Sequence, residues 1–338
     1  MRRSICGEFG GAIGAPCEVL TIGLVNNMPD SALRATERQF CALLGAASEG
    51  RLLKLQFYSL PGIKRSAGAH LHISRYYEAF AELERSPPDG IIVTGTEPQA
   101  PTLQQEPYWK ALARLVDWAD ERAIPSVWSC LAAHAAVLRL DNIERHALCA
   151  KMFGLFECQV NSAAHPILQG LPENWRVPHS RLYGLSESAL NSRGYTILSH
   201  SAQAGPDIFV RRKRGLQLFF QGHPEYTPAS LIGEYRRDIA RFLSGERNTY
   251  PELPRHYCGP VLESELARFA ERAREHRDAD LLTTFDELVA GAGPSHSWFQ
   301  TANRIYANWL SYLEGARSRR ALPTGFSKDR AGAIHLVA

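Results

Sequence analysis

The stretch Ile124-Pro-Ser-Val-Trp-Ser-Cys130, followed directly by Leu131-Ala-Ala-His-Ala-Ala-Val-Leu138, decides the fold. The first part is a short apolar run that predicts a buried strand, and the second is a run of small apolar residues that favours a helix. Cys130 stands at their junction. A side chain at such a strand-to-helix elbow is held out at the carboxyl edge of a sheet, where the helix dipole favours a thiolate. The elbow therefore indicates a nucleophilic cysteine in an α/β protein.

A second apolar run, Leu216-Gln-Leu-Phe-Phe-Gln-Gly-His-Pro-Glu225, predicts a strand that ends on His223 and Glu225. Gly222 permits a tight turn that aims both polar side chains out of the sheet edge. A thiol, a base and a carboxylate that orients the base are the parts of a cysteine acyl-transfer site. On residue chemistry alone, the alternative is a structural buried cysteine with a turn histidine and a surface glutamate.

The composition is that of an ordinary globular protein. The chain has 338 residues, 45% of them hydrophobic and 22% charged, with a formal net charge of +3. This charge is close to neutral for the size and gives no reason to expect a nucleic acid or an anionic membrane as partner. No apolar run approaches the roughly 20 residues of a membrane span, and the start lacks the apolar core of a signal peptide. We therefore expect a soluble cytoplasmic protein.

The seven cysteines are scattered and have no CxxC spacing. An odd number without paired spacings favours free thiols in a reducing compartment and argues against a zinc site. No other cluster of metal-ligating residues is visible, so no metal is predicted. His134, one helical turn after Cys130, is interpreted as a core residue rather than a base.

Strands and helices alternate along the first half of the chain. Continuous apolar runs, or an alternating pattern in the case of 52–58, predict the strands, and periodic apolar positions predict the helices between them. The expected strands are 19–25, 52–58 and 90–95, and the expected helices are 31–45, 76–83 and 108–122. This alternation is typical of a parallel sheet covered on both faces, with its active site at the carboxyl ends of the strands. The strand ends near Thr94, Cys130 and Phe220 should therefore converge on one cleft.

From about residue 147 the segments become shorter and more strand-like, which predicts antiparallel additions to the sheet. The expected strands are 155–160, 195–199, 207–211 and 216–220. Thr227 and Pro228 then begin a helix with a capping hydroxyl followed by a proline in the first turn. In that helix Glu234 and Arg237 lie away from the apolar stripe, where the usual outcome is a solvated pair.

We expect one α/β domain over residues 18–315. The Gly-rich residues 1–17 are predicted to be a flexible lead-in, and the basic residues 316–338 a poorly ordered tail. Residues 250–293 are predicted to be an insertion, with an irregular Pro-rich start and a charged helix from 263 to about 277. A closing helix is expected through Trp298, Ile305, Trp309 and Tyr312.

Several landmarks occur together in one order: Asn27-Met-Pro29, Thr36-Glu-Arg-Gln-Phe40, Ile92-Val-Thr-Gly95, Cys130, Lys151, Pro178-His-Ser-Arg181, Gly222-His-Pro-Glu-Tyr226, Arg237-Asp238 and Ala307-Asn-Trp-Leu310. With them the chain resembles the homoserine O-succinyltransferase / O-acetyltransferase family of methionine biosynthesis, over roughly residues 19–313. The resemblance implies a flavodoxin-like, class I glutamine-amidotransferase-like fold. Such a fold has a mostly parallel central sheet flanked by helices, here with antiparallel additions and C-terminal helices.

The resemblance also implies a mechanism for the triad. Cys130 would take the acyl group from acyl-CoA as a thioester, His223 would deprotonate the incoming hydroxyl, and Glu225 would orient His223. This is a ping-pong mechanism in which acyl-CoA is a co-substrate and no cofactor is permanently bound. Backbone N–H groups of Leu131 and Thr96 are expected to hold the oxyanion of each tetrahedral intermediate.

The resemblance places the amino-acid acceptor at Lys151, Ser180 and Arg237, and cationic side chains suit its carboxylate. The sequence departs from the family at Gln99, a position where Gly or Glu correlates with the choice between succinyl and acetyl donors. Glutamine can donate a hydrogen bond to a succinyl carboxylate, whereas glutamate would repel it, so the sequence favours succinyl-CoA over acetyl-CoA. Because the sequence departs from the family pattern, serine remains an alternative acceptor to L-homoserine.

Two other functions are compatible with the residues. A glutamine-amidotransferase-like cysteine hydrolase would use the same triad, but it has no general need of both Lys151 and Arg237. A non-catalytic protein that kept the fold is disfavoured because the whole triad is present. The resemblance implies a homodimer that binds small-molecule substrates.

Overall fold

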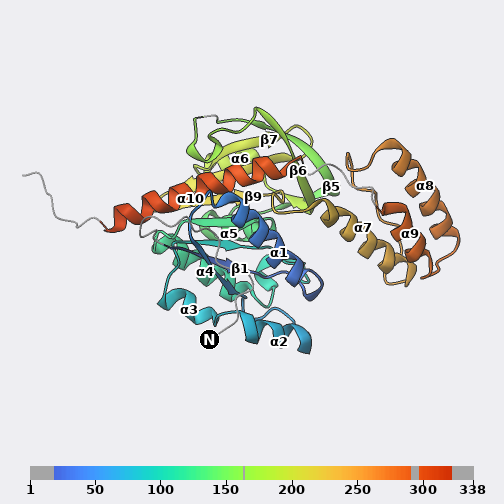
Figure 1. Ribbon diagram of the computed structural model, residues 1–338, viewed down its shortest axis with the longest axis horizontal. Coiled ribbons are helices and arrows are strands. Elements are labelled where there is room, and N and C mark those ends of the chain that lie inside the picture. Colours follow the sequence, from blue (N-terminus) through green and yellow to red (C-terminus); the bar gives the residue numbers. More distant parts are fainter. Residues whose placement is uncertain (1–18, 163, 291–296, 322–338) are drawn as a thin grey trace, which may run out of the picture.

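The computed structural model describes residues 19–162, 164–290 and 297–321. Across these residues one nine-stranded sheet has the order β2-β1-β3-β4-β9-β8-β7-β5-β6 (Figure 1). The strands are β1 (Leu20–Val25), β2 (Leu53–Tyr58), β3 (Gly90–Val93), β4 (Ser126–Ser129), β5 (His146–Val160), β6 (Asn174–Gly184), β7 (Thr196–Ser201), β8 (Gly205–Arg212) and β9 (Leu216–Phe220). Strands β2, β1, β3, β4 and β9 are parallel and form what we call the parallel half. Strands β8, β7, β5 and β6 pair antiparallel and form the antiparallel half.

Helices cover both faces of the parallel half, so its central strands are buried throughout. Along β3, Ile92 belongs to a core with α1 (Asp30–Ala47) and α10 (Phe299–Ala321). Its neighbours Ile91 and Val93 point to the opposite face, into a core with α4 (Trp109–Glu121) and α5 (Leu131–Asp141). All four residues of β3 and all four of β4 are buried. The connections of this half also contain α2 (Ala67–Tyr76), the short α3 (Phe80–Arg85) and the 3-10 turn η1 (Leu103–Gln105).

The antiparallel half is built on a long hairpin. Strand β5 pairs with β6 along most of its length, with Phe153 opposite Ser180 and Leu155 opposite Pro178, and reaches β7 at its far end. Strand β8 then joins this half to β9. The connections contain the 3-10 turn η2 (Pro166–Leu168) and α6 (Glu187–Ser192). The hairpin register brings residues that are about thirty positions apart in sequence onto one site.

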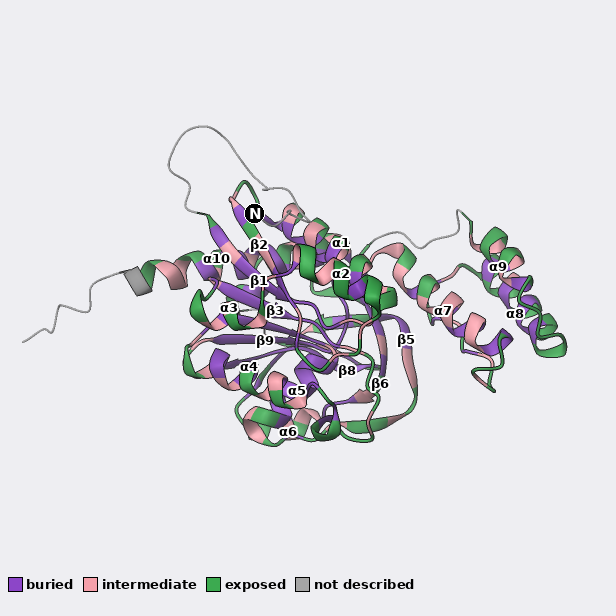
Figure 2. Ribbon diagram, turned by 90° about the horizontal axis from the view of Figure 1, so that it is seen from below, coloured by how far each residue is buried: buried purple, intermediate pink, exposed green. Residues whose placement is uncertain are grey.

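Three helices, α7 (Pro228–Leu243), α8 (Pro260–Glu275) and α9 (Leu281–Val289), form an arm at one end of the molecule (Figures 1 and 2). The arm has its own apolar core, which includes Phe153 and Leu155 of β5. At its base the Arg255 N–H donates to the Phe153 carbonyl and the Leu155 N–H donates to the Arg255 carbonyl, each at 2.9 Å. Between them Gly154 has φ +140°, and a Cβ there would lie 2.2 Å from the Arg255 oxygen. Glycine is therefore required at this junction.

The structure differs from the sequence-based elements in several places. The helix expected over 76–83 is instead the end of α2, an extended segment at Tyr77 and the separate helix α3. Strand β6 and helix α9 occur where the sequence predicted no element, and β5 begins nine residues before the expected 155. Helix α10 continues through 316–321, which were expected to belong to a poorly ordered tail. The expected lead-in 1–17 and the tail beyond Ala321 lie outside the described residues.

The thiols are mostly as expected. Cys130, Cys149, Cys158 and Cys258 are free. Cys41 is disulfide-bonded, so the expectation of free thiols is wrong for that residue. In the described part of the chain, no helix has both the length and the apolar character needed to cross a membrane.

Candidate active site

Cys130 occupies the one position between β4 and α5. Its backbone has φ 52° and ψ −114°, so the chain turns sharply there from strand to helix. The Cys130 N–H donates to the Phe220 carbonyl at 2.8 Å, and its own carbonyl accepts the N–H groups of Ala133 and His134. These bonds fix the elbow, and the thiol is half-buried at the carboxyl end of β4. The geometry is that predicted from the sequence.

His223 and Glu225 lie in the loop that follows β9, the neighbour of β4. Because Ser129 pairs with Phe220, the loops after these two strands begin side by side. His223 Nδ1 lies 2.9 Å from Glu225 Oε1, and both residues are buried. The other side of the imidazole interacts with the Cys130 thiol. The structure therefore brings the predicted thiol, imidazole and carboxylate together.

The charges of this group are coupled. Burial alone lowers the pKa of His223, but the negative charges of Cys130 and Glu225 and their hydrogen bonds outweigh it and hold the pKa well above its usual value. His223 is therefore an imidazolium when Cys130 is a thiolate. Such an ion pair is an activated form of a cysteine nucleophile.

Lys151, Ser180 and Arg237 come from β5, β6 and α7, and all three lie beside the Glu234 carboxylate. Asp238 is a second carboxylate here, 3.4 Å from Lys151 Nζ. Ser180 Oγ donates to Glu234 Oε2 at 2.5 Å, and Lys151 Nζ lies 3.7 Å from the same oxygen. Arg237 lies 4.0 Å from Glu234 and donates to Asp238 at 3.0 Å. The Tyr226 hydroxyl donates to Glu234 Oε1 at 2.6 Å. We call Lys151, Ser180, Tyr226, Glu234 and Arg237 the Glu234 cluster.

Glu234 is the residue that sequence reasoning missed. Its place opposite the apolar stripe of α7 predicted a solvated pair with Arg237, yet its side chain is only 18% exposed and accepts two hydroxyl hydrogen bonds. The partners that bury it come from the β5–β6 hairpin and from the loop after β9. No local pattern in the sequence signals contacts of this range, and the resemblance pointed only to its neighbours.

The loop after β3 borders the elbow. Gly95 packs against the start of α5, since a Cβ at Gly95 would lie 3.1 Å from the Leu131 nitrogen. Thr96 follows directly and is half-buried, so the two residues predicted to supply oxyanion N–H groups lie on adjoining segments. Gln99 is exposed further along this loop, and its N–H donates to the buried Glu106 at 2.7 Å. An ion pair of 3.2 Å between Glu97 and Arg241 connects the loop to α7.

A buried polar cluster packs against the loop that carries His223 and Glu225. Asp207 of β8 accepts the N–H of Gly222, the residue directly before His223, at 3.0 Å, and the hydroxyl of Ser199 at 3.2 Å. Burial raises the pKa of Asp207 to about 6, although these hydrogen bonds and the charge of Arg181 act in the opposite direction. A Cβ on Gly222 would lie 2.7 Å from Asp207 Oδ1, so the loop sits directly on this carboxylate.

Three members of this region, Cys158, His179 and Asp207, place possible ligand atoms within 4.8 Å of one another. Arg181 Nε donates to His179 Nδ1 at 3.3 Å, which leaves the imidazole proton on Nε2, facing Asp207 at 3.4 Å. A protonated Nε2 and a neighbouring guanidinium both oppose a cation. We therefore interpret the group as a hydrogen-bonded support for the loop.

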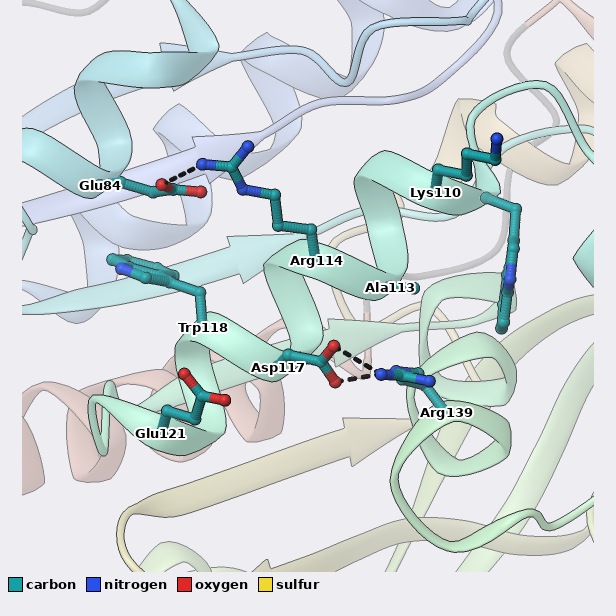
Figure 3. A pocket seen from close by; sticks show the side chains of 9 residues that line it. Glu84, Lys110, Ala113, Arg114, Asp117, Trp118, Glu121 and Arg139 are labelled. Atoms are coloured by element: carbon teal, nitrogen blue, oxygen red, sulfur yellow. Dashed lines mark hydrogen bonds and ion pairs between the residues drawn. The ribbon is translucent and has the colours of Figure 1, made fainter.

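His134 is a core residue, as the sequence predicted. It is buried and hydrogen-bonded to Gln221 at 3.0 Å, and burial lowers its pKa to about 3. A separate hollow lies over the outer face of α4 (Figure 3). Two ion pairs lie in it, Glu84 with Arg114 at 2.6 Å and Asp117 with Arg139 at 2.7 Å. It borders the far end of α5 from Cys130 and is separate from the candidate site.

The fold is shared with solved structures of low sequence identity. A protein from Thermoplasma acidophilum, described as a component of a GMP synthase, aligns with a TM-score of 0.50 and 14% identity, over 90% of this chain and 98% of that chain. At this identity the likeness concerns the fold alone. It confirms the class I glutamine-amidotransferase-like fold that the resemblance implied.

Sequence relatives are much closer. A curated homoserine O-succinyltransferase from Rhodopseudomonas palustris is 47% identical over 300 residues, which cover 88% of this chain and 90% of the relative. Another from Methylorubrum extorquens is 45% identical over 294 residues, covering 87% of each. The family model described as homoserine O-succinyltransferase matches residues 11–318. Matched over most of its length and nearly half identical to curated members, the chain belongs to the homoserine O-succinyltransferase family.

Proposed function

We propose that this protein transfers a succinyl group from succinyl-CoA to the hydroxyl of L-homoserine, through a thioester on Cys130, as a step of methionine biosynthesis. The observation that carries the proposal is the Cys130–His223–Glu225 triad beside a cluster with both charge signs. The names of the curated relatives support the donor and the acceptor.

In the first half-reaction the Cys130 thiolate attacks the thioester carbonyl of succinyl-CoA. The carbon–sulfur bond to CoA breaks, and the departing CoA thiolate takes the proton from the His223 imidazolium. N–H groups of Leu131 and Thr96 at the elbow would hold the oxyanion formed on the way. The products are free CoA and a succinyl-Cys130 thioester.

In the second half-reaction neutral His223 accepts the proton of the homoserine hydroxyl as the oxygen attacks the succinyl thioester. The bond to Cys130 breaks, and the thiolate–imidazolium pair is restored with O-succinylhomoserine as product. Glu225 keeps the imidazole oriented in both steps.

The Glu234 cluster suits a zwitterionic α-amino acid. Lys151 and Arg237 would bind its carboxylate, and Glu234 with Ser180 would bind its ammonium group. Serine has the same two ends but is one methylene shorter. A difference of this size is worth about 10- to 200-fold in discrimination, so homoserine and serine have to be compared directly.

Gln99 is our proposed determinant of donor choice. Its exposed amide in the loop beside the elbow can donate to the free carboxylate of a succinyl group. Gln99→Glu would place two negative charges together and should lower activity with succinyl-CoA far more than with acetyl-CoA. Equal losses with both donors would remove Gln99 from this role.

The proposal is tested by the mass of the intact protein after brief incubation with succinyl-CoA or acetyl-CoA without acceptor. We expect an adduct of one succinyl mass that L-homoserine discharges and L-serine does not. Cys130→Ala should give no adduct, and Cys149→Ser, which removes an exposed free thiol, should give the normal one. Discharge of the adduct by L-serine would identify serine, in place of homoserine, as the acceptor. If neither donor forms an adduct while Cys130 is still alkylated, the acyl-CoA proposal is wrong and an amide hydrolase is favoured.

A homodimer and a cytoplasmic location complete the proposal. Sedimentation of the purified protein tests the first, and fractionation of the cells that make it tests the second.

A further inference from the structure

Tyr226 is the member of the Glu234 cluster that also contacts the triad. Its ring stacks on the His223 imidazole, with centroids 4.2 Å apart and planes inclined by 18°. Its hydroxyl donates to Glu234 Oε1 at 2.6 Å, and Ser180 donates to the other oxygen of that carboxylate at 2.5 Å. The side chain is 8% exposed, so these contacts are made out of water.

We propose that Tyr226 is a positioning residue that couples the base to the acceptor site: its ring holds the His223 imidazolium and its hydroxyl orients the Glu234 carboxylate. The part that concerns Glu234 rests on the proposed function, because it assumes an amino-acid acceptor. The part that concerns His223 requires only the observed thiol and imidazole.

The ring acts on the charged state of His223. An aromatic face attracts a cation, and the effect grows when water is excluded. The charges that act on His223 are those of Cys130 at the start of α5 and Glu225 in the same loop. The Tyr226 ring stacks on it, and His179 of β6 interacts with it. The charge of Arg181 of β6 acts on Cys130 and is unchanged in every variant. Burial and the charges of Arg181 and His223 hold the pKa of His179 well below its usual value, so it adds no competing positive charge. Removing the ring should therefore destabilise the protonated form of His223. The thiolate of Cys130, which is paired with it, should then form less readily.

The hydroxyl acts on Glu234. A carboxylate that accepts one hydroxyl at each oxygen is fixed in its plane, and a charge-assisted hydrogen bond of this kind is stronger than a neutral one. Without the Tyr226 donor, Glu234 keeps the bond from Ser180 and the ion pairs with Lys151 and Arg237, all at Oε2, and loses the hydrogen bond that orients Oε1. Acceptor binding should weaken, whereas the reaction with acyl-CoA should not.

The backbone of Tyr226 is held independently of its side chain. Its N–H donates to the His223 carbonyl at 3.1 Å, and its carbonyl accepts Trp298 Nε1 at 2.8 Å. These bonds remain when the side chain is replaced, so variants at this position test the ring and the hydroxyl separately.

The experiment compares Tyr226→Phe, Tyr226→Leu and the control Tyr235→Phe in the full chain. Tyr235 is also a buried tyrosine of this region, adjacent to Glu234 in sequence, and its hydroxyl donates to Tyr250. Each variant is characterised by melting temperature, by steady-state kinetics with homoserine, and by the rate of Cys130 alkylation by iodoacetamide between pH 5 and 9.

Tyr226→Phe should raise the KM for homoserine about 10-fold or more and leave the alkylation profile in place. Tyr226→Leu should in addition lower the alkylation rate at mildly acidic pH about 3- to 10-fold and move the profile toward alkaline pH. Tyr235→Phe should change neither.

An unchanged homoserine KM in Tyr226→Phe would overturn the role of the hydroxyl, and an unmoved alkylation profile in a folded Tyr226→Leu would overturn that of the ring. A loss of melting temperature with equal losses in every other readout would make Tyr226 merely structural. If the wild type does not acylate homoserine but the alkylation profile still moves in Tyr226→Leu, the proposed function fails and the coupling to His223 stands.

Discussion

The parallel and antiparallel halves of the sheet each contribute part of the candidate site, and they do so by different means. In the parallel half, Cys130 is placed by local chain geometry, since a four-residue buried strand runs directly into a helix. In the antiparallel half, Lys151 and Ser180 are placed by the register of a long hairpin, and they meet Glu234 only because α7 packs beside them. A nucleophile can thus be positioned by one turn of chain, whereas a binding site for a charged small molecule needs several distant segments.

The largest effect should come from breaking the junction of the two halves at Gly222. A Cβ there would lie 2.4 Å from Val177 Cγ1 and 2.7 Å from Asp207 Oδ1, so Gly222→Ala must displace the loop that carries His223. We expect a fall in kcat of about 100-fold or more, because small misplacements of a reacting group are costly, and a loss of about 1–3 kcal/mol in stability.

The control for this variant is Gly233→Ala. Gly233 lies in α7, where a Cβ would meet nothing within 4 Å. Steady-state kinetics gives kcat for both variants, and thermal unfolding gives their stability. A near-normal kcat in Gly222→Ala would show that the reaction tolerates a displacement of the loop that carries His223.

Glu234→Gln should separate the contributions of the two halves. The amide keeps the shape but loses the charge that we assign to the acceptor ammonium group, so the KM for homoserine should rise about 10- to 100-fold. Formation of the acyl-enzyme from succinyl-CoA, which depends on the parallel half, should stay within about 3-fold. Rapid-quench acylation and steady-state assays measure the two steps. Equal losses in both would mean that Glu234 also serves the triad.

The two halves should also respond to pH with opposite sign. The pKa of Asp207 in β8 is raised to about 6 from 3.8, so between these values the folded protein holds a proton that the unfolded chain has released. Its stabilising contribution is complete below pH 3.8 and is lost as pH rises through 6. The pKa of His134 in α5 is lowered to about 3 from 6.5, so its contribution is present above pH 6.5 and is lost as pH falls.

Asp207→Asn isolates the first of these effects. Relative to the wild type, the variant should gain about 2 kcal/mol in unfolding free energy as pH rises from 4 to 7, because asparagine has no proton to release. Urea unfolding at several pH values measures the difference. If the difference in unfolding free energy between wild type and variant does not change with pH, Asp207 does not titrate between pH 4 and 7.

The smallest effect is expected for Glu97→Gln. Its ion pair with Arg241 links the loop of Gln99 to α7, but both side chains are substantially exposed. Exposed pairs contribute under about 1 kcal/mol, so stability and acceptor KM should hardly change. A marked change in donor preference would reveal that this link positions the Gln99 loop.

The parallel half could be predicted closely from the sequence, because its strands are short apolar or alternating runs separated by helical patterns. Cys130 and His223 follow from the same reasoning, since adjacent parallel strands end at one edge. The exceptions are local: Tyr77 has an extended backbone that separates α2 from α3 within a pattern that favours a single helix.

The antiparallel half and the arm could be predicted only in part. Strand β6 contains Pro178 and charged residues and lacks a clear alternation, so its pairing with β5 depends on tertiary context. Glu234 shows the same limit for the site, because its burial comes from Ser180 and Tyr226, which lie 54 and 8 residues away. The resemblance identified Lys151, Ser180 and Arg237 without showing what joins them.

The backbone of Cys130 has a consequence for the evolution of this chain. Its φ of 52° with ψ of −114° is a conformation that side-chain-bearing residues avoid, at a cost of about 1–3 kcal/mol. Glycine adopts it freely. A Cys130→Gly chain should therefore be inactive and yet more stable than the wild type. Selection for stability alone would favour glycine here, so a cysteine at this position is what the proposed role as nucleophile would require.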